Sequence, residues 1–146
     1  MRKTIPFIIT ILFFIVVASA YSKTQQTYGN LVCGFVKNYD GDTITVNIPD
    51  VHPIIGKHIS VRINGIDTPE LRGTTGEIKE KARTAKRMVT NLCKKAKILE
   101  LRNIKRGKYF RIVADVYVDE KCLADTLIKN GLAKPYDGGK KPQWYE

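Results

Sequence analysis

The chain has 146 residues, of which 43% are hydrophobic and 27% charged, and its formal net charge is +11. This length suits one domain with its own core rather than several domains. The basic excess fits an anionic polymer as partner, because each phosphate that a protein neutralises releases condensed counterions. Charge that only keeps the protein soluble is the simpler alternative.

Residues 1–20 have the three parts of a secretory signal. Arg2 and Lys3 precede an apolar run over residues 7–18, and a small-residue motif ends at Ala20. The apolar run is shorter than the roughly 20 residues that span a bilayer. We therefore expect cleavage after Ala20, which lowers the net charge to +9, and a secreted or periplasmic protein that meets a membrane only during export. The alternative is an uncleaved N-terminal anchor, with the folded part still outside the cytoplasm.

A polar linker over residues 21–30 is followed by a series of expected strands. Apolar side chains alternate or cluster over residues 31–37, 43–48, 59–63, 98–104 and 110–118. Asp40-Gly41 is expected to form the turn between the first two strands. Within the third strand, the apolar side chains alternate with polar ones, which places Arg62 on the face opposite the apolar set.

Two helices are expected among these strands. The first covers residues 77–92, with apolar residues at helical spacing and a basic opposite face. Thr74 and Glu77 have the spacing of a capping box at its start. The second helix covers residues 122–130 and ends at Gly131, which is a typical C-terminal cap.

This order of elements predicts an α+β, mainly β fold. About five short strands, with one helix before the last two, indicate a five-stranded OB-type barrel with two helices. The domain is expected over residues 31–136, followed by a turn-rich tail over residues 137–146.

Acidic residues are concentrated in two turns at strand ends. Asp40 and Asp42 precede one strand, and Asp67 and Glu70 follow another. Clustered carboxylates repel one another unless a cation lies between them, and Ca²⁺ takes carboxylate and carbonyl oxygens as ligands. The pattern indicates a cation site, although each turn alone also fits an ordinary hairpin turn or helix start. The spacing does not fit an EF-hand.

Basic residues accompany these acids. Arg62 lies five residues before Asp67, and a second basic stretch covers residues 105–111. An arginine fork can bind a phosphate through two nitrogens. Phosphodiester hydrolysis requires such positive charge and a carboxylate that orients water. The combination indicates phosphate chemistry; the simpler interpretation of residues 105–111 is a solvated hairpin.

The cysteines and histidines do not form a metal motif. Cys33, Cys93 and Cys122 are an odd number, which in an oxidising compartment allows one disulfide and one thiol, in any of three pairings. No CxxC motif or Cys/His cluster is present, so zinc is not expected. His52 and His58 are expected in loops or at strand edges.

Four segments resemble the staphylococcal nuclease (thermonuclease) family in order and spacing. They are residues 36–46 (VKNYDGDTITV), 61–71 (VRINGIDTPEL), 109–118 (YFRIVADVYV) and 131–134 (GLAK). The resemblance covers roughly residues 31–136. It implies an OB-fold barrel and a Ca²⁺-dependent, sugar-nonspecific endonuclease for DNA and RNA. The implied reaction cleaves the P–O5′ bond and leaves 3′-phosphate ends.

The resemblance implies roles for individual acidic residues. Asp42 and Asp67 match the family's calcium carboxylates, and Thr68 matches the residue that supplies a backbone carbonyl ligand. Asp40 matches an acid behind these ligands. Glu70 corresponds to the catalytic glutamate, usually described as the general base.

The resemblance also implies which residues contact the phosphate and the rest of the substrate. Arg62 and Arg111 match the two catalytic arginines that hold the phosphate and neutralise the transition state. The residues expected to line the substrate groove are Lys108, Tyr109 and Tyr136.

The chain departs from the family pattern in three places. Phe110 stands where the best-known member has a glycine, and residues 70–88 form a short segment for the family. The sequence continues only to residue 146, so we expect most of the family's C-terminal helix to be lacking. We expect this shortening to affect stability more than chemistry, and a disulfide could compensate for it.

Two other functions are compatible with parts of the pattern. One is a noncatalytic exported OB-fold nucleic-acid-binding protein, which would use a basic groove and aromatic stacking. The presence of all five matched acid and arginine positions favours the enzyme instead. The other is an exported calcium-dependent interaction protein, which no sequence feature supports. We expect a monomer that acts on DNA and RNA without a stable protein partner.

Overall fold

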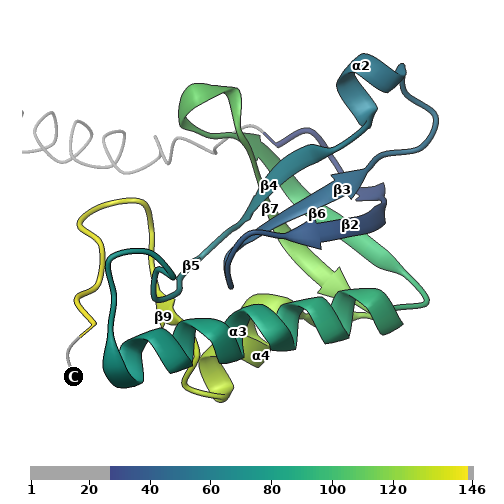
Figure 1. Ribbon diagram of the computed structural model, residues 1–146. Coiled ribbons are helices and arrows are strands. Elements are labelled where there is room, and N and C mark those ends of the chain that lie inside the picture. Colours follow the sequence, from purple (N-terminus) through teal and green to yellow (C-terminus); the bar gives the residue numbers. More distant parts are fainter. Residues whose placement is uncertain (1–26, 145–146) are drawn as a thin grey trace, which may run out of the picture.

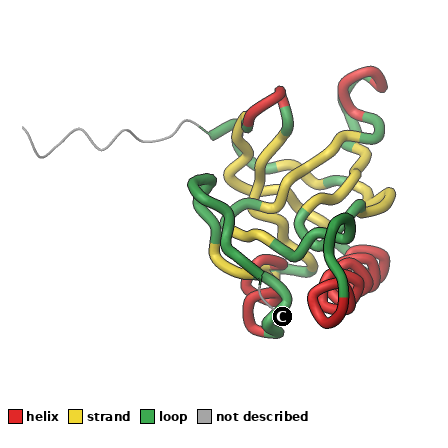
Figure 2. The backbone as a smooth tube through the Cα atoms, turned by 60° about the vertical axis from the view of Figure 1, so that its left-hand side comes forward, coloured by secondary structure: helices red, strands yellow, loops and turns green. Residues whose placement is uncertain are grey.

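The computed structural model describes residues 27–144. A curled β-sheet lies above a long helix, α3 (Gly76–Lys95), and a short helix, α4 (Leu123–Lys129), lies beside it (Figures 1 and 2). The expected signal segment lies outside the described residues, as does most of the expected linker. Among residues 27–144, no helix has the length and apolar character needed to cross a bilayer.

The main sheet is mixed, in the order β1-β6-β7-β4-β3-β2, with β8 beside β7. Strands β4 and β7 pair in parallel, and the other neighbours pair antiparallel. A small second sheet consists of β5 (Ile66–Asp67) and β9 (Lys134–Pro135). The strands of the main sheet are β1 (Leu31–Val32), β2 (Gly34–Asn38), β3 (Thr43–Asn47), β4 (Ile59–Ile63), β6 (Leu99–Arg106), β7 (Ile112–Val118) and β8 (Lys121–Cys122).

The sheet curls because one segment contributes to both of its edges. Strands β1 and β2 are separated only by Cys33, yet β1 pairs with β6 and β2 pairs with β3. The Cys33 N–H donates to the Leu99 carbonyl at 2.9 Å, which continues the pairing with β6. Hydrogen bonding to β6 already begins before residue 31, where the Tyr28 N–H donates to the Ile104 carbonyl at 2.8 Å. The result is an OB-like α+β fold.

The core lies between the curled sheet and the two helices. Ile44, Val46 and Val61 on the inner side of the sheet are fully buried. Helix α3 contributes Ala85 and Val89 from the apolar face that its sequence predicts. Burial of this face holds α3 under the turns that carry the acidic residues.

The structure confirms strands at all five expected places and both expected helices, with differences at their ends, but the first expected strand is divided at Cys33 into β1 and β2. The capping box at Thr74 and Glu77 is wrong: α3 begins after Thr75, and the Thr74 hydroxyl instead donates to the Glu70 carbonyl at 2.6 Å. Gly131 ends α4 as expected, with φ of +67°. The sequence did not predict the short strands β5, β8 and β9, the short helix α2 (Pro53–Gly56) or the 3₁₀ turn η1 (Lys108–Phe110).

The three cysteines are free thiols. Cys33 and Cys93 are 7% and 4% exposed, whereas Cys122 is half-buried. Burial raises the pKa of Cys33 and of Cys93 to about 12, and the neighbouring Cys33 adds to the shift at Cys93. Two of the thiols therefore act as small apolar core residues.

Candidate active site

The acidic turns meet because the strands that carry them are neighbours. Strands β3 and β4 pair with Thr43 opposite Arg62, and Asp42 directly precedes β3. The Ile63 N–H donates to the Asp42 carbonyl at 2.8 Å, which extends this pairing by one residue. Asp67 follows in β5, after a turn that leaves β4. Residues that are 25 positions apart in the sequence therefore lie in one site.

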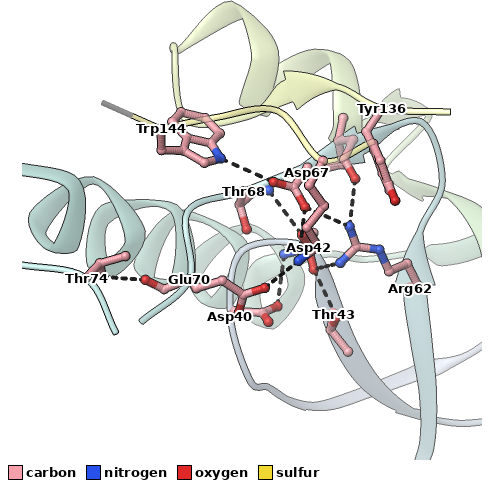
Figure 3. Close-up of polar contacts among 12 residues, drawn as sticks. Asp40, Asp42, Thr43, Arg62, Asp67, Thr68, Glu70, Thr74, Tyr136 and Trp144 are labelled. Carbon is pink, nitrogen blue, oxygen red and sulfur yellow. Dashed lines mark hydrogen bonds and ion pairs between the residues drawn. The ribbon is translucent and has the colours of Figure 1, made fainter. Parts of the chain in front are cut away.

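Arg62 joins Asp42 and Asp67 (Figure 3). Its Nη1 donates to Asp42 Oδ1, while its Nη2 lies 3.3 Å from Asp67 Oδ1 and 3.1 Å from the Ile66 carbonyl. The Asp42 and Asp67 side chains are only 4% and 2% exposed. A guanidinium shared between two buried carboxylates offsets their mutual repulsion. The expected position of Arg62, opposite the apolar face of its strand, is confirmed.

Both carboxylate oxygens of Asp42 accept hydrogen bonds. The Thr43 hydroxyl donates to Oδ1 at 3.0 Å, and the Thr68 N–H donates to Oδ2 at 3.1 Å. Thr68 is 2% exposed, and its own hydroxyl has no hydrogen-bond partner within residues 27–144. Such buried, unpaired hydroxyls are uncommon. The Thr68 hydroxyl is therefore a polar group close to Asp42 that could still accept or donate a hydrogen bond or bind a cation.

Gly41 allows the two acidic turns to pack closely. A Cβ atom at this position would lie 2.8 Å from Thr68 Cγ2 and 2.8 Å from Ala85 Cβ. These distances are too short for carbon atoms, so a larger residue would push the turn away from Thr68 and from α3. The glycine between Asp40 and Asp42 is therefore required by close approach.

Asp40 supports Asp42 from behind. Its Oδ1 accepts the Asp42 N–H at 3.1 Å, and it is 9% exposed. Burial raises the pKa of Asp40 to about 6, and the negative charge of Asp42 contributes further. The raised pKa therefore reflects burial of the carboxyl first and the neighbouring charge of Asp42 second.

Glu70 faces a more open part of the site. Its backbone is held by the Thr74 hydroxyl, while its side chain is 53% exposed. The side chain lines a depression together with Arg62 and Arg111. A carboxylate in this position can reach a water molecule or a substrate that enters the depression.

A basic groove continues from this depression. Arg62, Arg111 and Tyr136 line both the depression and the groove. The Arg62 guanidinium lies 5.9 Å from the centroid of the Tyr136 ring. The other basic residues of the groove are Lys105, Arg106 and Lys108.

Tyr109 is not grouped with the other expected groove residues. It is 94% exposed and is not one of the residues that line the depression or the groove. The chain turns at this point, where Tyr109 has a left-handed backbone with φ of 58°. The structure thus brings Lys108 and Tyr136 to the site and leaves Tyr109 outside it.

The oxygen donors of the site suit a hard cation. Asp42 and Asp67 offer carboxylates, Thr68 offers a backbone carbonyl, and Ca²⁺ prefers these ligand types. Arg62 already places positive charge between the two carboxylates, and the unpaired Thr68 hydroxyl lies beside them. In the described part of the chain, no three His, Cys, Asp or Glu side chains converge as a metal-ligand group. The expected ligand set contains only two such side chains.

Two residues at this site were missed by sequence reasoning. Trp144 donates its indole N–H to Asp67 Oδ2 at 3.2 Å, and Lys141 lies 2.6 Å from Glu70 Oε1 (Figure 3 shows Trp144). Both belong to the tail, which the sequence predicts only to be turn-rich. The sequence marks Trp144 only as the single tryptophan of the chain, three residues after Lys141, and carries no signal for its contact with Asp67.

The fold and the site define an OB-like protein in which carboxylates and arginines meet in one depression. The family model described as staphylococcal nuclease homologue matches residues 60–145, more than half of the chain. The chain belongs to this staphylococcal nuclease family.

Two curated relatives from Bacillus subtilis (strain 168) are similar to this chain. Endonuclease YncB is 34% identical over 116 residues, which cover 78% of this chain and 51% of YncB. The SPbeta prophage-derived endonuclease YokF is 36% identical over 97 residues, which cover 65% of this chain and 31% of YokF. The chain thus spans about half of one relative and a third of the other.

Proposed function

We propose that this protein is a Ca²⁺-dependent, sugar-nonspecific endonuclease that hydrolyses phosphodiester bonds of DNA and RNA. The observation that carries the proposal is that Arg62 pairs with the buried Asp42 and Asp67 and also lines a depression with Glu70, which continues into a basic groove. Family membership and two relatives named as endonucleases support it. The proposed products, by the family resemblance, carry 3′-phosphate ends.

The acidic side of the site would hold the cation. Asp42 and Asp67 would supply carboxylate oxygens, and Thr68 its carbonyl. When bound there, a calcium ion would supply positive charge that polarises the phosphate and stabilises the transition state.

The remaining residues would act directly on water and phosphate. Glu70 would accept a proton from the attacking water, because its carboxylate is half exposed in the depression. Arg111 is exposed beside it and would bind phosphate oxygens as negative charge builds up. Arg62 would share this role while it keeps the two aspartates together.

The groove favours recognition of the nucleic-acid backbone rather than of bases. Its basic residues can bind phosphates, and phosphate contacts carry no sequence information. Tyr136 adds one aromatic ring that can stack on a base or sugar. This composition supports activity on both DNA and RNA.

We also propose that the protein acts outside the cytoplasm. The N-terminal pattern of residues 1–20 supports export, and a basic exported nuclease would meet nucleic acids in the medium or the periplasm. Detection of the protein, shortened after Ala20, in culture medium or periplasmic extract would test this part.

The primary test is cleavage by purified residues 21–146 of single-stranded DNA, double-stranded DNA and RNA. Each substrate is incubated with Ca²⁺, with Mg²⁺ and with a chelator. Cleavage that requires Ca²⁺ and yields 3′-phosphate ends supports the proposal. Salt-sensitive binding by folded protein without any cleavage would instead indicate the noncatalytic binding protein.

Glu70→Gln tests the chemical role of the glutamate. Loss of a positioned general base lowers the rate by about 10²- to 10⁴-fold, whereas the amide keeps nearly the same size. We expect this loss in turnover, with nucleotide binding largely retained, in the same cleavage assay. Glu77→Gln, on the exposed side of α3, is the matched control. Undiminished cleavage by Glu70→Gln would remove Glu70 from the mechanism.

A further inference from the structure

The C-terminal segment, residues 134–144, lies against the acidic residues of the site. It begins with β9, in which Lys134 pairs with Asp67 in the register of the small second sheet. The Tyr136 N–H then donates to the Gly65 carbonyl at 2.9 Å. This pairing starts the segment directly beside Asp67, and Figure 3 shows Trp144 returning to the same carboxylate.

The C-terminal segment is braced by contacts within itself. The Tyr136 hydroxyl donates to the Gly139 carbonyl at 3.0 Å, and the Gly139 N–H donates to Asp137 Oδ1 at 3.0 Å. The Lys134 ammonium donates to the Gln143 carbonyl at 2.8 Å, which connects the two ends of the segment. The fold therefore holds Lys141 and Trp144 in defined positions.

Trp144 contacts Asp67 through a neutral donor. Its indole N–H lies 3.2 Å from Asp67 Oδ2, while Asp67 Oδ1 faces Arg62. Lys134 and Lys81 approach its ring at 4.6 Å and 5.7 Å from the centroid. A neutral N–H fixes the orientation of a carboxylate but leaves its negative charge uncompensated. This contact therefore keeps Asp67 oriented for a cation.

Lys141 contacts the same acids through a full positive charge. Its Nζ lies 2.6 Å from Glu70 Oε1 and 3.6 Å from Asp67 Oδ1. The Lys141 and Glu70 side chains are 54% and 53% exposed, so the pair can separate at modest cost. An ammonium beside Asp67 reduces the negative charge that would attract a divalent cation. This contact therefore opposes cation binding.

We propose that the C-terminal segment sets the cation affinity of the site through these two contacts, with Trp144 as a positioning residue for Asp67 and Lys141 as a tethered competitor of the cation. The inference rests on the proposed function, because it concerns the same cation site. It assigns opposite effects to two residues only three positions apart.

The test compares Ca²⁺ binding by isothermal calorimetry in wild-type residues 21–146 and in three variants. Trp144→Phe removes the N–H donor and keeps an aromatic ring between the lysines. We expect it to weaken Ca²⁺ binding by about 10-fold, as is typical when a partner of a metal ligand is lost. Lys141→Met removes the charge and keeps the length, and we expect it to tighten binding by about 2- to 5-fold.

Lys140→Met is the matched control for Lys141→Met. Lys140 is the neighbouring lysine, is exposed, and makes no contact with the acidic residues among the described residues. We expect its Ca²⁺ affinity to equal that of the wild type. Thermal unfolding of each variant shows whether the fold is retained. Emission from Trp144, the only tryptophan, should change on Ca²⁺ addition at lower concentrations in Lys141→Met than in the wild type.

The outcomes separate the inference from the proposed function. Wild-type protein that binds Ca²⁺ and cleaves, with unchanged affinity in Trp144→Phe and Lys141→Met, would overturn the inference and leave the function intact. Weaker binding in both variants would also overturn it, because it would indicate general loosening of the segment. Wild-type protein that neither binds Ca²⁺ nor cleaves would overturn both proposals.

Discussion

At the scale of single residues, Arg62 is the positively charged partner that Asp42 and Asp67 share in the interior of the site. The two carboxylates are nearly fully buried, and the guanidinium contacts both. Gly41 lets Thr68 approach the same point, and the Thr68 N–H binds the second oxygen of Asp42. Each of these side chains thus has a stabilising partner as well as a proposed chemical role.

Removal of the Arg62 side chain is expected to lower the stability of the protein. Arg62→Ala leaves two buried carboxylates without their guanidinium, and an unpaired buried charge costs about 3–5 kcal/mol. We expect the free energy of unfolding without Ca²⁺ to fall by about 3 kcal/mol. Added Ca²⁺ should restore more stability to the variant than to the wild type, because it replaces the lost positive charge. Urea denaturation with and without Ca²⁺ measures both effects.

Arg83→Ala is the matched control for this experiment. Arg83 pairs with Glu80 on the surface of α3, where the side chains are 52% and 63% exposed. Its loss should change the free energy of unfolding by less than about 1 kcal/mol. Equal stability of Arg62→Ala and wild-type protein in the absence of Ca²⁺ would contradict the buried-pair argument.

At the scale of elements, helix α3 supports the turn between β2 and β3. Asn38 lies at the end of β2 and is 7% exposed. Its amide donates to the Asp40 carbonyl at 2.8 Å and to the Lys86 carbonyl of α3 at 3.0 Å, and its carbonyl oxygen accepts the Thr90 hydroxyl at 2.6 Å. One buried side chain thus joins the helix to the acidic turn.

Asn38→Ala should therefore weaken both the fold and the site. The substitution leaves buried polar groups without partners, which costs about 1–3 kcal/mol. We expect a loss of stability in this range, seen by thermal or urea unfolding, together with reduced cleavage because the Asp40 turn loses its support. Asn91→Ala, on the exposed surface of the same helix, should be nearly neutral. An Asn38→Ala variant of wild-type stability would show that α3 holds the turn by apolar packing alone.

At the scale of the whole molecule, charge and burial are distributed unevenly. The chain is strongly basic, yet Asp40 and Glu70 line the depression next to the basic groove, and Arg62 connects it to the buried Asp42 and Asp67. The curled sheet is held together by the segment around Cys33, which is buried against the core.

Nucleic-acid binding is expected to depend strongly on salt. The groove contains four basic residues besides Arg62, and a protein that neutralises four phosphates of a single strand shows a slope of about −3 in log K against log salt concentration. Glu70→Gln is the protein for this measurement, because it should bind without cutting. Lys105→Gln and Lys108→Gln together should make the slope shallower by about 1.4. A slope near zero would exclude a phosphate-binding groove.

Thiol reactivity is expected to divide the cysteines into two groups. At pH 8 the half-buried Cys122 should react with a thiol reagent, whereas Cys33 and Cys93 should react only after unfolding, because they are buried and their pKa values are raised to about 12. Cys122→Ser should abolish the reaction of the native protein. Equal reaction of all three native thiols, or a disulfide found by mass spectrometry, would contradict the structure.

The raised pKa values of Cys33 and Cys93 also make the stability of the fold depend on pH. The unfolded thiols ionise near pH 9.0, whereas the buried thiols keep their protons up to about pH 12. Stability from these groups is therefore complete below pH 9 and is lost as the pH rises from 9 toward 12.

Local patterns in the sequence by themselves determined most of the strands, the two longest helices and the family. Alternation in residues 59–63 identified a strand and placed Arg62 opposite the core, because side chains on a strand alternate between its two faces. Helical spacing identified α3, and the motifs around Asp42 and Asp67 identified the family. These features depend on neighbours within a few positions, so they can be read along the chain.

Only the tertiary structure decided which distant residues meet. Trp144 binds Asp67 across 77 positions, and no local periodicity of the tail indicates this contact. The reduced state of Cys33 and Cys93, the joining of both sheet edges through residue 33, and the absence of Tyr109 from the groove lining likewise depend on how elements pack. Such contacts arise when several elements bury their apolar faces together, and a sequence pattern records each face but not the partner that covers it.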